Sequence, residues 1–358
     1  MNAPQPRAGV LKVQPYVAGE STIANVKRVI KLASNEGALG PSPKAVAAAR
    51  GTAQSLCRYP DGGCVELRQA LARHYHLDAA NITCGAGSDE LIGILIRAYA
   101  GAGDEVLCSQ YGFLMYAIGA TAVGATPVMA PEKDITADID SLLRHVSPKT
   151  RLVFLANPNN PTGTYLPASE IRRLHRGLPK NVLLVLDSAY TEYMTEADYE
   201  SGVELAATAD NVVVTRTFSK IHALGGLRVG WCTGAPAVID VINRVRGPFN
   251  VSTPAQNAAI AALADQGHVD KVREHTRRWR DRVTTALRKL GFTVTDSFGN
   301  FVLINFGDTT RADAADAHLR RHGIILRPLK PYGLTHCLRA TIGTGGEMRA
   351  MLAALKTF

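Results

Sequence analysis

The chain is 358 residues long, 46% of its residues are hydrophobic, and it carries a formal net charge of +9. This length exceeds the usual size of a single hydrophobic core, so we expect a globular protein with two packed regions. No apolar run reaches the roughly 18 residues that a membrane helix needs, and the opening MNAPQPRAGVLKVQPYVAGE holds no apolar segment of signal-peptide length. We therefore expect a cytoplasmic protein with no membrane segment.

Two further features of the composition exclude classes of function. The six cysteines are scattered without a CxxC pair, and the sequence has no HExxH, so it predicts neither a metal site nor a disulfide framework. The densest basic stretch begins at Lys271. Its apolar residues recur at helical spacing, at Trp279, Val283, Leu287 and Leu290. This stripe predicts a helix that packs on a core with its arginines in solvent, which argues against nucleic acid as a partner.

In chain order, the first predicted unit is an N-terminal arm. Residues 1–38 contain several prolines and predict an extended segment that joins the smaller domain or a neighbouring subunit. From residue 81 to residue 234, short β-branched runs alternate with helical stretches. The predicted strands are NITCG, DEVLCS, ATPVMA, RLVFLA, VLLVLD, NVVVTRTF and RVGWCTG. This alternation predicts an α/β fold with a mainly parallel seven-stranded sheet, covered by helices on both faces.

The pattern changes after PFNVSTP at 248–254, where a long helical stretch is followed by mixed short strands and helices. We therefore expect a large domain over residues 39–247 and a smaller α+β domain over residues 248–358. In sheets of this kind, ligands bind beyond the carboxyl ends of the strands. The polar residues that follow the predicted strands are the candidates for chemistry.

Three of these strand ends are informative only together. The loop GAGSDE at 85–90 opens a helical run, so its backbone N–H groups favour an anion such as phosphate, although a plain turn explains it equally well. Tyr111 follows the next strand, where its ring could stack on a flat cofactor or simply pack. The turn NPNNPTG at 157–163 offers amide side chains to ligand oxygens, or serves only as a tight turn.

Two other strands end in charged side chains. Asp187 ends an apolar strand, where its carboxylate needs a partner in a ligand or in the protein. Lys220 ends another in NVVVTRTFSK, where burial lowers the pKa of an amine and makes it able to form a Schiff base. Thr217 and Ser219 precede this lysine, and Arg228 follows it in GGLR.

Taken together, these residues suit pyridoxal 5′-phosphate better than any other common cofactor. That molecule needs a lysine, an acid at its ring nitrogen and a phosphate cradle. A metal-dependent hydrolase would lack its ligands here, and a serine hydrolase its nucleophile elbow. A nucleotide-binding dehydrogenase is disfavoured because Glu90 replaces the third glycine of its fingerprint.

Over nearly its whole length the chain resembles the fold type I aminotransferases, and within them the histidinol-phosphate aminotransferase group. The runs that carry the resemblance are KLASNEGALGPSP at 31–43, RYPDG at 58–62, GAGSDELI at 85–92, ANPNNPTG at 156–163, DSAY at 187–190, TFSKIHALGGLRVGW at 217–231 and LRATIGT at 338–344. The resemblance implies a fold type I pyridoxal-phosphate transferase. One departure is Gly37 and Ala38, where many relatives have Asn and Pro near the substrate entrance.

By this resemblance, Lys220 forms the internal aldimine and Asp187 holds the protonated pyridine nitrogen. Asn160 and Tyr190 bond the phenolic oxygen of the cofactor, and Tyr111 stacks on its ring. The residues implied for the phosphate are the backbone at Ser88 and Asp89, the side chains of Thr217, Ser219 and Arg228, and Tyr59 reaching in from the other subunit. The site is then shared across a homodimer.

For the substrate, the resemblance implies that Arg339 binds its anionic group, with Arg327 as a second candidate. Asn160 lies beside the substrate, and Tyr16 closes over it. The implied reaction is a ping-pong transamination of L-histidinol phosphate with 2-oxoglutarate to imidazole acetol phosphate and L-glutamate, in histidine biosynthesis, with Lys220 as both tether and base.

Other readings of the same residues remain open. An aromatic amino-acid aminotransferase for phenylalanine or tyrosine, or a dual-specificity enzyme, would share this scaffold. A pyridoxal-phosphate-dependent decarboxylase would use the same fold. A ligand-sensing regulator fused to a DNA-binding module is disfavoured, because the Pro-bearing arm fits no helix-turn-helix.

Overall fold

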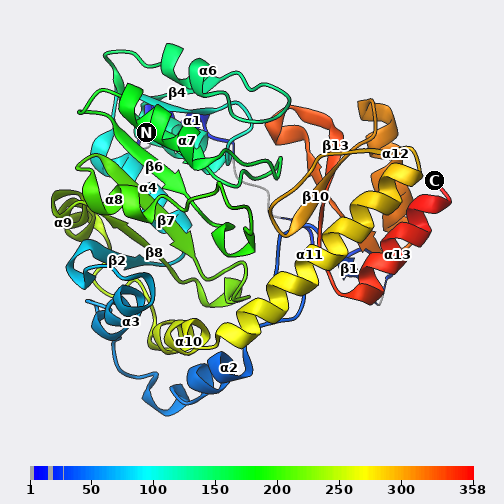
Figure 1. The fold of residues 1–358 in the computed structure, drawn as a ribbon, viewed down its shortest axis with the longest axis horizontal. Coiled ribbons are helices and arrows are strands. Elements are labelled where there is room, and N and C mark those ends of the chain that lie inside the picture. The colour runs from blue at the N-terminus through cyan, green and yellow to red at the C-terminus, as the bar shows by residue number, and fades with distance from the viewer. Residues whose placement is uncertain (1–3, 15–18, 27) are drawn as a thin grey trace.

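The computed structural model describes residues 4–14, 19–26 and 28–358. Within that part of the chain, seven strands form one large sheet in the order β2-β8-β7-β6-β5-β3-β4 (Figure 1). Their bounds are β2 Ile82–Gly85, β3 Glu105–Ser109, β4 Thr126–Ala130, β5 Thr150–Ala156, β6 Leu183–Asp187, β7 Val212–Thr217 and β8 Gly230–Gly234. Each of the seven strands predicted from the sequence is confirmed.

The direction of the strands makes this sheet mainly parallel, as predicted. The strands β4, β3, β5, β6 and β7 pair in parallel, each with its neighbour in the sheet. Only β8 differs among them, since it runs antiparallel to β7 on one side and to β2 on the other. Every residue of β6 and β7 is buried, which agrees with the apolar sequence of β6 and of the first half of β7.

Helices cover both faces of the large sheet. On one face, the apolar sides of α4 Ser88–Tyr99, α5 Met115–Val123 and α9 Pro236–Val245 form a core with the sheet. On the other face lie α6 Ile139–Arg144, α7 Ala168–Gly177 and α8 Val203–Thr208. A third group packs against β2 and β8 and comprises α2 Pro43–Arg50, α3 Val65–Tyr75 and α10 Thr253–Leu263.

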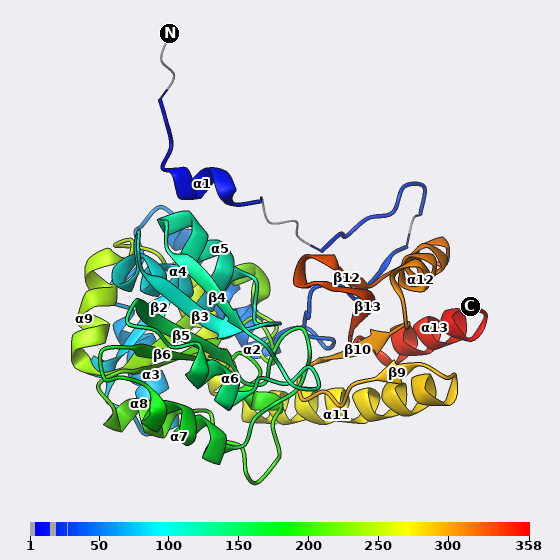
Figure 2. The ribbon, with the colours of Figure 1, turned by 90° about the horizontal axis from the view of Figure 1, so that it is seen from above.

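A second, antiparallel sheet lies towards the C-terminus in the order β12-β13-β10-β9. Its strands are β12 Arg327–Leu329, β13 Leu334–Thr341, β10 Phe301–Asn305 and β9 Thr293–Val294. Its core is completed by α12 Thr309–Arg321, α13 Gly345–Lys356 and the second half of α11 Gln266–Lys289. Figures 1 and 2 show α11 running from the α10 side of the large sheet to this smaller sheet.

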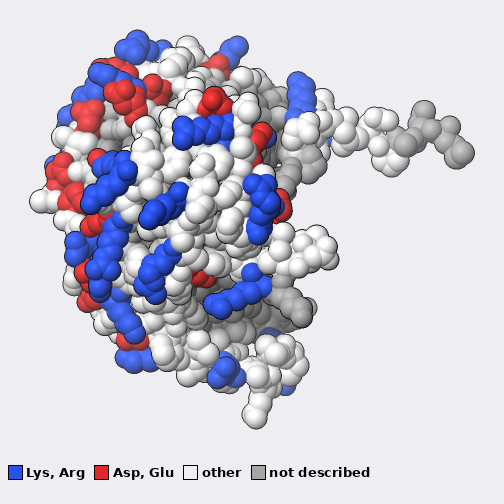
Figure 3. Space-filling model, turned by 90° about the vertical axis from the view of Figure 1, so that its right-hand side faces the viewer, with Lys and Arg blue, Asp and Glu red and all other residues white. Residues whose placement is uncertain are grey.

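Helix α11 is the helix predicted from the basic stretch. Trp279, Val283 and Leu287 face the C-terminal core, as expected. The prediction for Leu290 was wrong: the helix ends at Lys289, and Leu290 is 37% exposed. Figure 3 shows Lys and Arg side chains spread over the face that carries the C-terminal part of the molecule, with Asp and Glu side chains among them. Several arginines of α11 pair with acids of the same helix, as Arg277 does with Glu274 at 2.9 Å.

The N-terminal segment contacts both parts of the molecule. Its strand β1 Ile30–Lys31 pairs in parallel with β11 Ile324–Ile325 beside the smaller sheet. Helix α1 Ala8–Lys12 lies against α5, where Gly9 closely approaches the backbone of the α5 C-terminus (Figure 2).

The division into an arm and two domains stays a prediction. The packing of α10 on α2 and α3 groups residues 253–263 with the helices of the large sheet, a few residues beyond the predicted boundary. No helix of the described segments combines the length and the apolar character needed to cross a membrane.

Candidate active site

A cavity of about 590 Å³ lies where β5, β6 and β7 reach their carboxyl ends. This is where ligands bind in sheets with mainly parallel strands. Nine of the residues predicted from the sequence line it: Ser88, Asp89, Asn160, Asp187, Tyr190, Thr217, Ser219, Lys220 and Arg228. They come from five separate segments of the chain, so the fold brings together what the sequence separates.

Lys220 follows the end of β7 and lines this cavity. Burial, and then the positive charge of Arg339, lower the pKa of its amine to about 8. Its Nζ lies 5.7 Å from the centre of the Tyr190 ring. With this pKa about a tenth of the amine is neutral at pH 7, far more than in an exposed lysine, and the neutral form is the one that acts as a nucleophile or base.

Asp187 is the last residue of β6, and its carboxylate is held by two hydroxyl groups. Tyr116 donates to Oδ2 at 2.7 Å, and Thr215 donates to Oδ1 at 3.4 Å. Burial raises the pKa of this carboxyl group, whereas the two hydrogen bonds and the charge of Lys220 act in the opposite direction. Tyr116 is itself fixed because its ring stacks on Phe154 at 4.5 Å.

Tyr190 and Asn160 approach the cavity from two different loops. The Tyr190 hydroxyl accepts a hydrogen bond from Asn35 Nδ2 at 2.8 Å, and burial raises its pKa to about 12, so the phenol stays protonated at neutral pH. The side-chain oxygen of Asn160 accepts a hydrogen bond from Arg339. Arg339 lies on β13 and also donates to Ala33 O at 2.9 Å, which links the smaller sheet to the mouth of the cavity.

Groups that favour an anion gather at the start of α4. This helix begins at Ser88, and the N–H groups of its first turn have no partner within the helix. Thr217 donates to Ser219 at 3.0 Å, and the guanidinium group of Arg228 donates to Gly225 O at 3.0 Å. Backbone N–H groups, hydroxyl groups and a guanidinium group thus converge at one end of the cavity.

Close packing of glycines makes this cluster possible. A Cβ atom at Gly87 would overlap the Arg228 guanidinium, and Gly87 also has a φ of +85°. A Cβ atom at Gly230 would overlap the backbone N of Ser88. The start of α4, strand β8 and the arginine therefore lie closer together than larger residues would permit.

The cavity fits pyridoxal phosphate on the chemistry of its lining. The buried carboxylate of Asp187 suits a protonated ring nitrogen, and the cluster at the start of α4 suits a phosphate group. Lys220 shares the same cavity with both of these sites. No other buried carboxylate is needed to complete such a set.

The stacking role predicted for Tyr111 stays a prediction, and a second aromatic ring, that of Phe113, also approaches the cavity. In the described residues, Phe113 lines the cavity, whereas the Tyr111 ring packs against Leu303 and Leu334 of the smaller sheet. The cause is the turn after β3, where the N–H of Gly112 bonds to Ser109 O at 2.9 Å and directs the two rings to different sides.

The structure places the remaining predicted residues away from the cavity lining or does not describe them. Tyr59 is 82% exposed and stacks on Phe249, with ring centres 4.6 Å apart. Arg327 lies on β12, directly opposite Arg339 in the register of the two strands. Tyr16 falls outside the described residues.

Sequence reasoning missed three residues that shape the site, namely Phe113, Tyr116 and Asn35. Phe113 and Tyr116 are three residues apart where the chain enters α5, and their ring centres lie 5.8 Å apart. That spacing was a usable signal. Asn35 gave none by itself, because its hydrogen bond to Tyr190 joins residues that are 155 positions apart.

Comparisons with known proteins agree with this site. The family model for aminotransferase class I and II matches residues 27–355. A histidinol-phosphate aminotransferase of Paramagnetospirillum magneticum is 55% identical over 360 residues, covering 100% of this chain and 99% of that protein. Another, from Rhodospirillum rubrum, is 54% identical over 358 residues, covering 99% of this chain and 97% of that protein.

Solved structures agree as well. The crystal structure of histidinol-phosphate aminotransferase from Sinorhizobium meliloti in complex with pyridoxal-5′-phosphate superposes with a TM-score of 0.87 at 33% identity, covering 92% of this chain and 91% of that one. The resemblance and the fold type I architecture predicted from the sequence are both confirmed. The chain is thus an enzyme of the class I and II aminotransferase family and, within it, belongs to the histidinol-phosphate aminotransferases.

Proposed function

We propose that this enzyme transfers the amino group of L-histidinol phosphate to 2-oxoglutarate, giving imidazole acetol phosphate and L-glutamate, in a ping-pong cycle. The observation that carries the proposal is a lysine with a pKa lowered to about 8 in one cavity with a buried carboxylate and a cluster of anion donors. Relatives named for this activity are 54% and 55% identical over nearly the whole chain.

The cofactor in this proposal is pyridoxal 5′-phosphate. When bound, it accepts the electrons released as the substrate Cα–H bond breaks, and it carries the amino group between the two half-reactions. Asp187 holds its ring nitrogen, and Asn160 and Tyr190 hold its phenolic oxygen. Phe113, which lines the cavity, would pack on its ring, the role that the sequence predicts for Tyr111. The phosphate group is held by the backbone at Ser88 and Asp89 and by the side chains of Thr217, Ser219 and Arg228.

The side chains of the enzyme then have separate roles. With the cofactor bound, Lys220 Nζ would be the base that takes the proton from the substrate Cα and passes it on to the cofactor. The hydrogen bonds from Tyr116 and Thr215 favour the ionised form of Asp187, which keeps the ring nitrogen protonated. Tyr190 keeps its proton, so it remains a hydrogen-bond donor throughout the cycle.

The substrates differ in the anion that they present, and the arginines must accept both. L-Histidinol phosphate carries a phosphate group and no α-carboxylate, whereas 2-oxoglutarate carries two carboxylates. In this proposal Arg339, whose guanidinium group bonds to Asn160 of the cavity lining, binds either anion in a forked geometry. Arg327, opposite it on β12, is the second candidate.

The cofactor assignment is tested by borohydride reduction of the loaded enzyme, followed by peptide mass spectrometry. The expected result is a pyridoxyl group on Lys220 in the wild-type protein and on no peptide of Lys220→Ala. Protein that takes up no pyridoxal phosphate would refute the assignment. The control Lys180→Ala changes an exposed lysine and is expected to leave the modification of Lys220 intact.

The substrate is tested by comparing kcat/KM for histidinol phosphate, phenylalanine and tyrosine under one set of conditions. A preference for histidinol phosphate is expected. Higher efficiency with phenylalanine or tyrosine would assign the enzyme to the aromatic amino-acid aminotransferases instead. Comparable values for all three would indicate dual specificity.

The enzyme also works as a cytoplasmic homodimer in this proposal, with Tyr59 reaching the phosphate site of the second subunit. The support is an exposed apolar group on one side of the large sheet, in which Leu56 is 68% exposed, Tyr59 82% and Phe249 47%. Mixing Lys220→Ala with Tyr59→Ala is expected to restore activity, because a mixed dimer contains one site with both residues intact. No recovery from a mixture shown to have exchanged subunits would contradict a shared site.

A further inference from the structure

Arg216 lies at the end of β7 between two residues that face the active site. Its neighbours Thr215 and Thr217 bond to Asp187 and Ser219, on the cavity side of the sheet. Successive side chains of a strand point to opposite faces, so Arg216 extends to the other side. Its side chain is only 2% exposed there.

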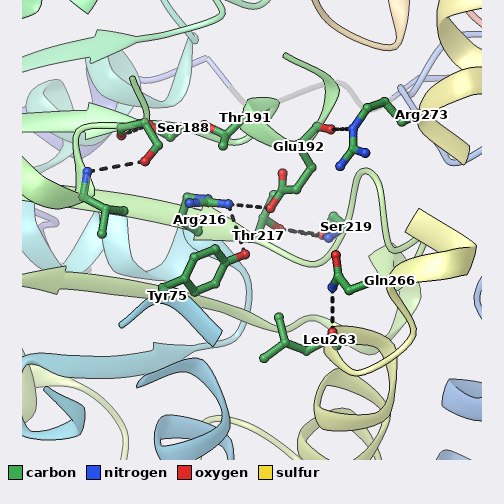
Figure 4. Close-up of polar contacts among 12 residues, drawn as sticks. Tyr75, Ser188, Thr191, Glu192, Arg216, Thr217, Ser219, Leu263, Gln266 and Arg273 are labelled. Carbon is green, nitrogen blue, oxygen red and sulfur yellow. Dashed lines mark hydrogen bonds and ion pairs between the residues drawn. The ribbon is translucent and has the colours of Figure 1, made fainter. Parts of the chain in front are cut away.

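A carboxylate and two aromatic rings surround the guanidinium group of Arg216, and Figure 4 shows two of these partners, Glu192 and Tyr75. Its Nη2 donates to Glu192 Oε1 at 2.7 Å and to the Tyr75 hydroxyl at 3.2 Å. The guanidinium carbon lies 4.9 Å from the centre of the Tyr75 ring and 5.4 Å from that of Trp231. Glu192 is 11% exposed, so both charges are buried.

Glu192 is joined closely to Tyr190 through the backbone. It lies in the short 3₁₀ helix Thr191–Tyr193, which starts directly after Tyr190. The N–H of Tyr193 bonds to Tyr190 O at 3.0 Å, so the turn moves as one unit with the tyrosine. The carbonyl oxygen of Glu192 also accepts a hydrogen bond from Arg273 Nε of α11 at 2.6 Å (Figure 4).

A buried ion pair is a poor device for stability alone, because apolar residues of similar volume often stabilise a fold at least as well. Its distinctive property is a fixed geometry. We propose that Glu192 and Arg216 are positioning residues, which hold the Tyr190 hydroxyl group within hydrogen-bonding distance of the cofactor. This inference rests on the proposed function. Both residues act from the face of β7 opposite the cavity and do not touch the cofactor or the substrate.

The test is Glu192→Asp, which keeps the charge and shortens the reach to Arg216 by one methylene group. We expect the Kd for pyridoxal phosphate, measured by quenching of intrinsic fluorescence in cofactor-free protein, to rise about tenfold, a change that corresponds to one displaced hydrogen bond. We expect kcat to fall about tenfold while KM for the amino donor stays within about twofold, as when an interaction with the reacting centre is lost.

Two comparisons separate positioning from general destabilisation. Glu192→Gln keeps the length and an acceptor oxygen for Arg216, so it is expected to restore both the Kd and kcat to within about threefold of wild type. Glu196→Asp shortens a carboxylate four residues further along the same loop. This carboxylate accepts a hydrogen bond from the N–H of Thr195 and does not bond to Arg216. It is expected to match the wild type.

Several outcomes would overturn this inference. One is a Glu192→Asp enzyme with a lower Tm but wild-type Kd and kcat, which would reduce the pair to a structural role. Another is a Glu192→Gln enzyme whose Kd and kcat change as much as those of Glu192→Asp, because the effect would then come from the lost charge and not from the geometry. A wild-type protein that takes up no pyridoxal phosphate would refute the proposed function, and this inference with it.

If Glu192→Asp does not fold, Arg273→Met provides a second test. It removes the hydrogen bond to the Glu192 carbonyl from a side chain that is 30% exposed, so no buried charge is left unpaired. It is expected to change the Kd and kcat in the same direction by a smaller factor, and wild-type values would overturn the inference.

Discussion

The lowered pKa of Lys220 predicts that replacing this lysine stabilises the cofactor-free protein. Burial holds the pKa at about 8 in the folded state, against a usual value of 10.5. Below pH 8 the amine is charged in both states, and the folded protein bears the full cost of burying that charge. As the pH rises from 8 to 10.5, the folded form loses its proton first, so the cost declines.

The size of the effect follows from the shift. A pKa lowered by about 2.5 units corresponds to about 3 kcal/mol at pH 7, since each unit is worth about 1.4 kcal/mol. At pH 10 only about 1 kcal/mol remains, because most of the folded protein is already neutral there. Lys220→Met removes the charge at nearly constant volume, so it should raise the free energy of unfolding by these amounts.

The assay is denaturant unfolding of cofactor-free wild type and Lys220→Met at pH 7 and pH 10. Lys180→Met, at an exposed position, is the control and should change stability by less than about 0.5 kcal/mol at both values. A gain from Lys220→Met that is the same at pH 7 and pH 10 would refute the reasoning, because it would come from packing and not from charge burial.

Three further predictions concern residues that line the cavity or pack beside it. Tyr116→Phe removes a hydrogen bond that lowers the pKa of Asp187. The acid limb of the pH profile of kcat should therefore move to higher pH, and kcat should fall about tenfold. An unchanged acid limb would show that this hydrogen bond does not affect the pKa of the carboxyl group. Phe113→Ala should raise the Kd for pyridoxal phosphate at least about tenfold, and Tyr111→Ala should raise it much less, because only the Phe113 ring lines the cavity. Fluorescence titration measures both values. A larger rise in Tyr111→Ala would support the stacking role that the sequence predicts for Tyr111. Gly230→Ala forces a Cβ atom into the backbone at the start of α4, so Tm and cofactor affinity should fall together, and a variant with wild-type affinity would show that the helix start can shift without loss of the site.

The sheet and the ends of its strands were predictable from the sequence because they depend on local pattern. Short apolar runs with β-branched residues located β6 and β7. Asp187 ends β6, and Lys220 lies three residues beyond the end of β7, so the strand ends marked the positions of both. The direction of β8 was not predictable in the same way. An apolar run carries no sign of whether its strand runs parallel or antiparallel to its neighbours.

One open prediction, for Tyr111, and one error, for Leu290, have a physical explanation in short segments. The turn after β3 decides whether Tyr111 or Phe113 faces the cavity, and both rings are equally compatible with a strand end. The end of α11 at Lys289 leaves Leu290 exposed, and helix ends are set by capping more than by apolar spacing.

The burial of Arg216 was hidden for a different reason. In the sequence it stands between two threonines at the end of an apolar run, and its partners Tyr75 and Glu192 are 141 and 24 residues away. Such long-range pairs leave no trace in local composition.

Helix α11 contacts both the large sheet domain and the smaller sheet, so it couples their positions. Its 24 residues span about 36 Å as one continuous rod. Arg273 near one end grips the Glu192 carbonyl, while Val283 and Leu287 near the other end are embedded in the C-terminal core. A rotation of the smaller sheet relative to the larger one would therefore bend α11 or displace the turn that follows Tyr190. A change in the angle between the two sheets would therefore reach Tyr190, a residue that lines the cavity.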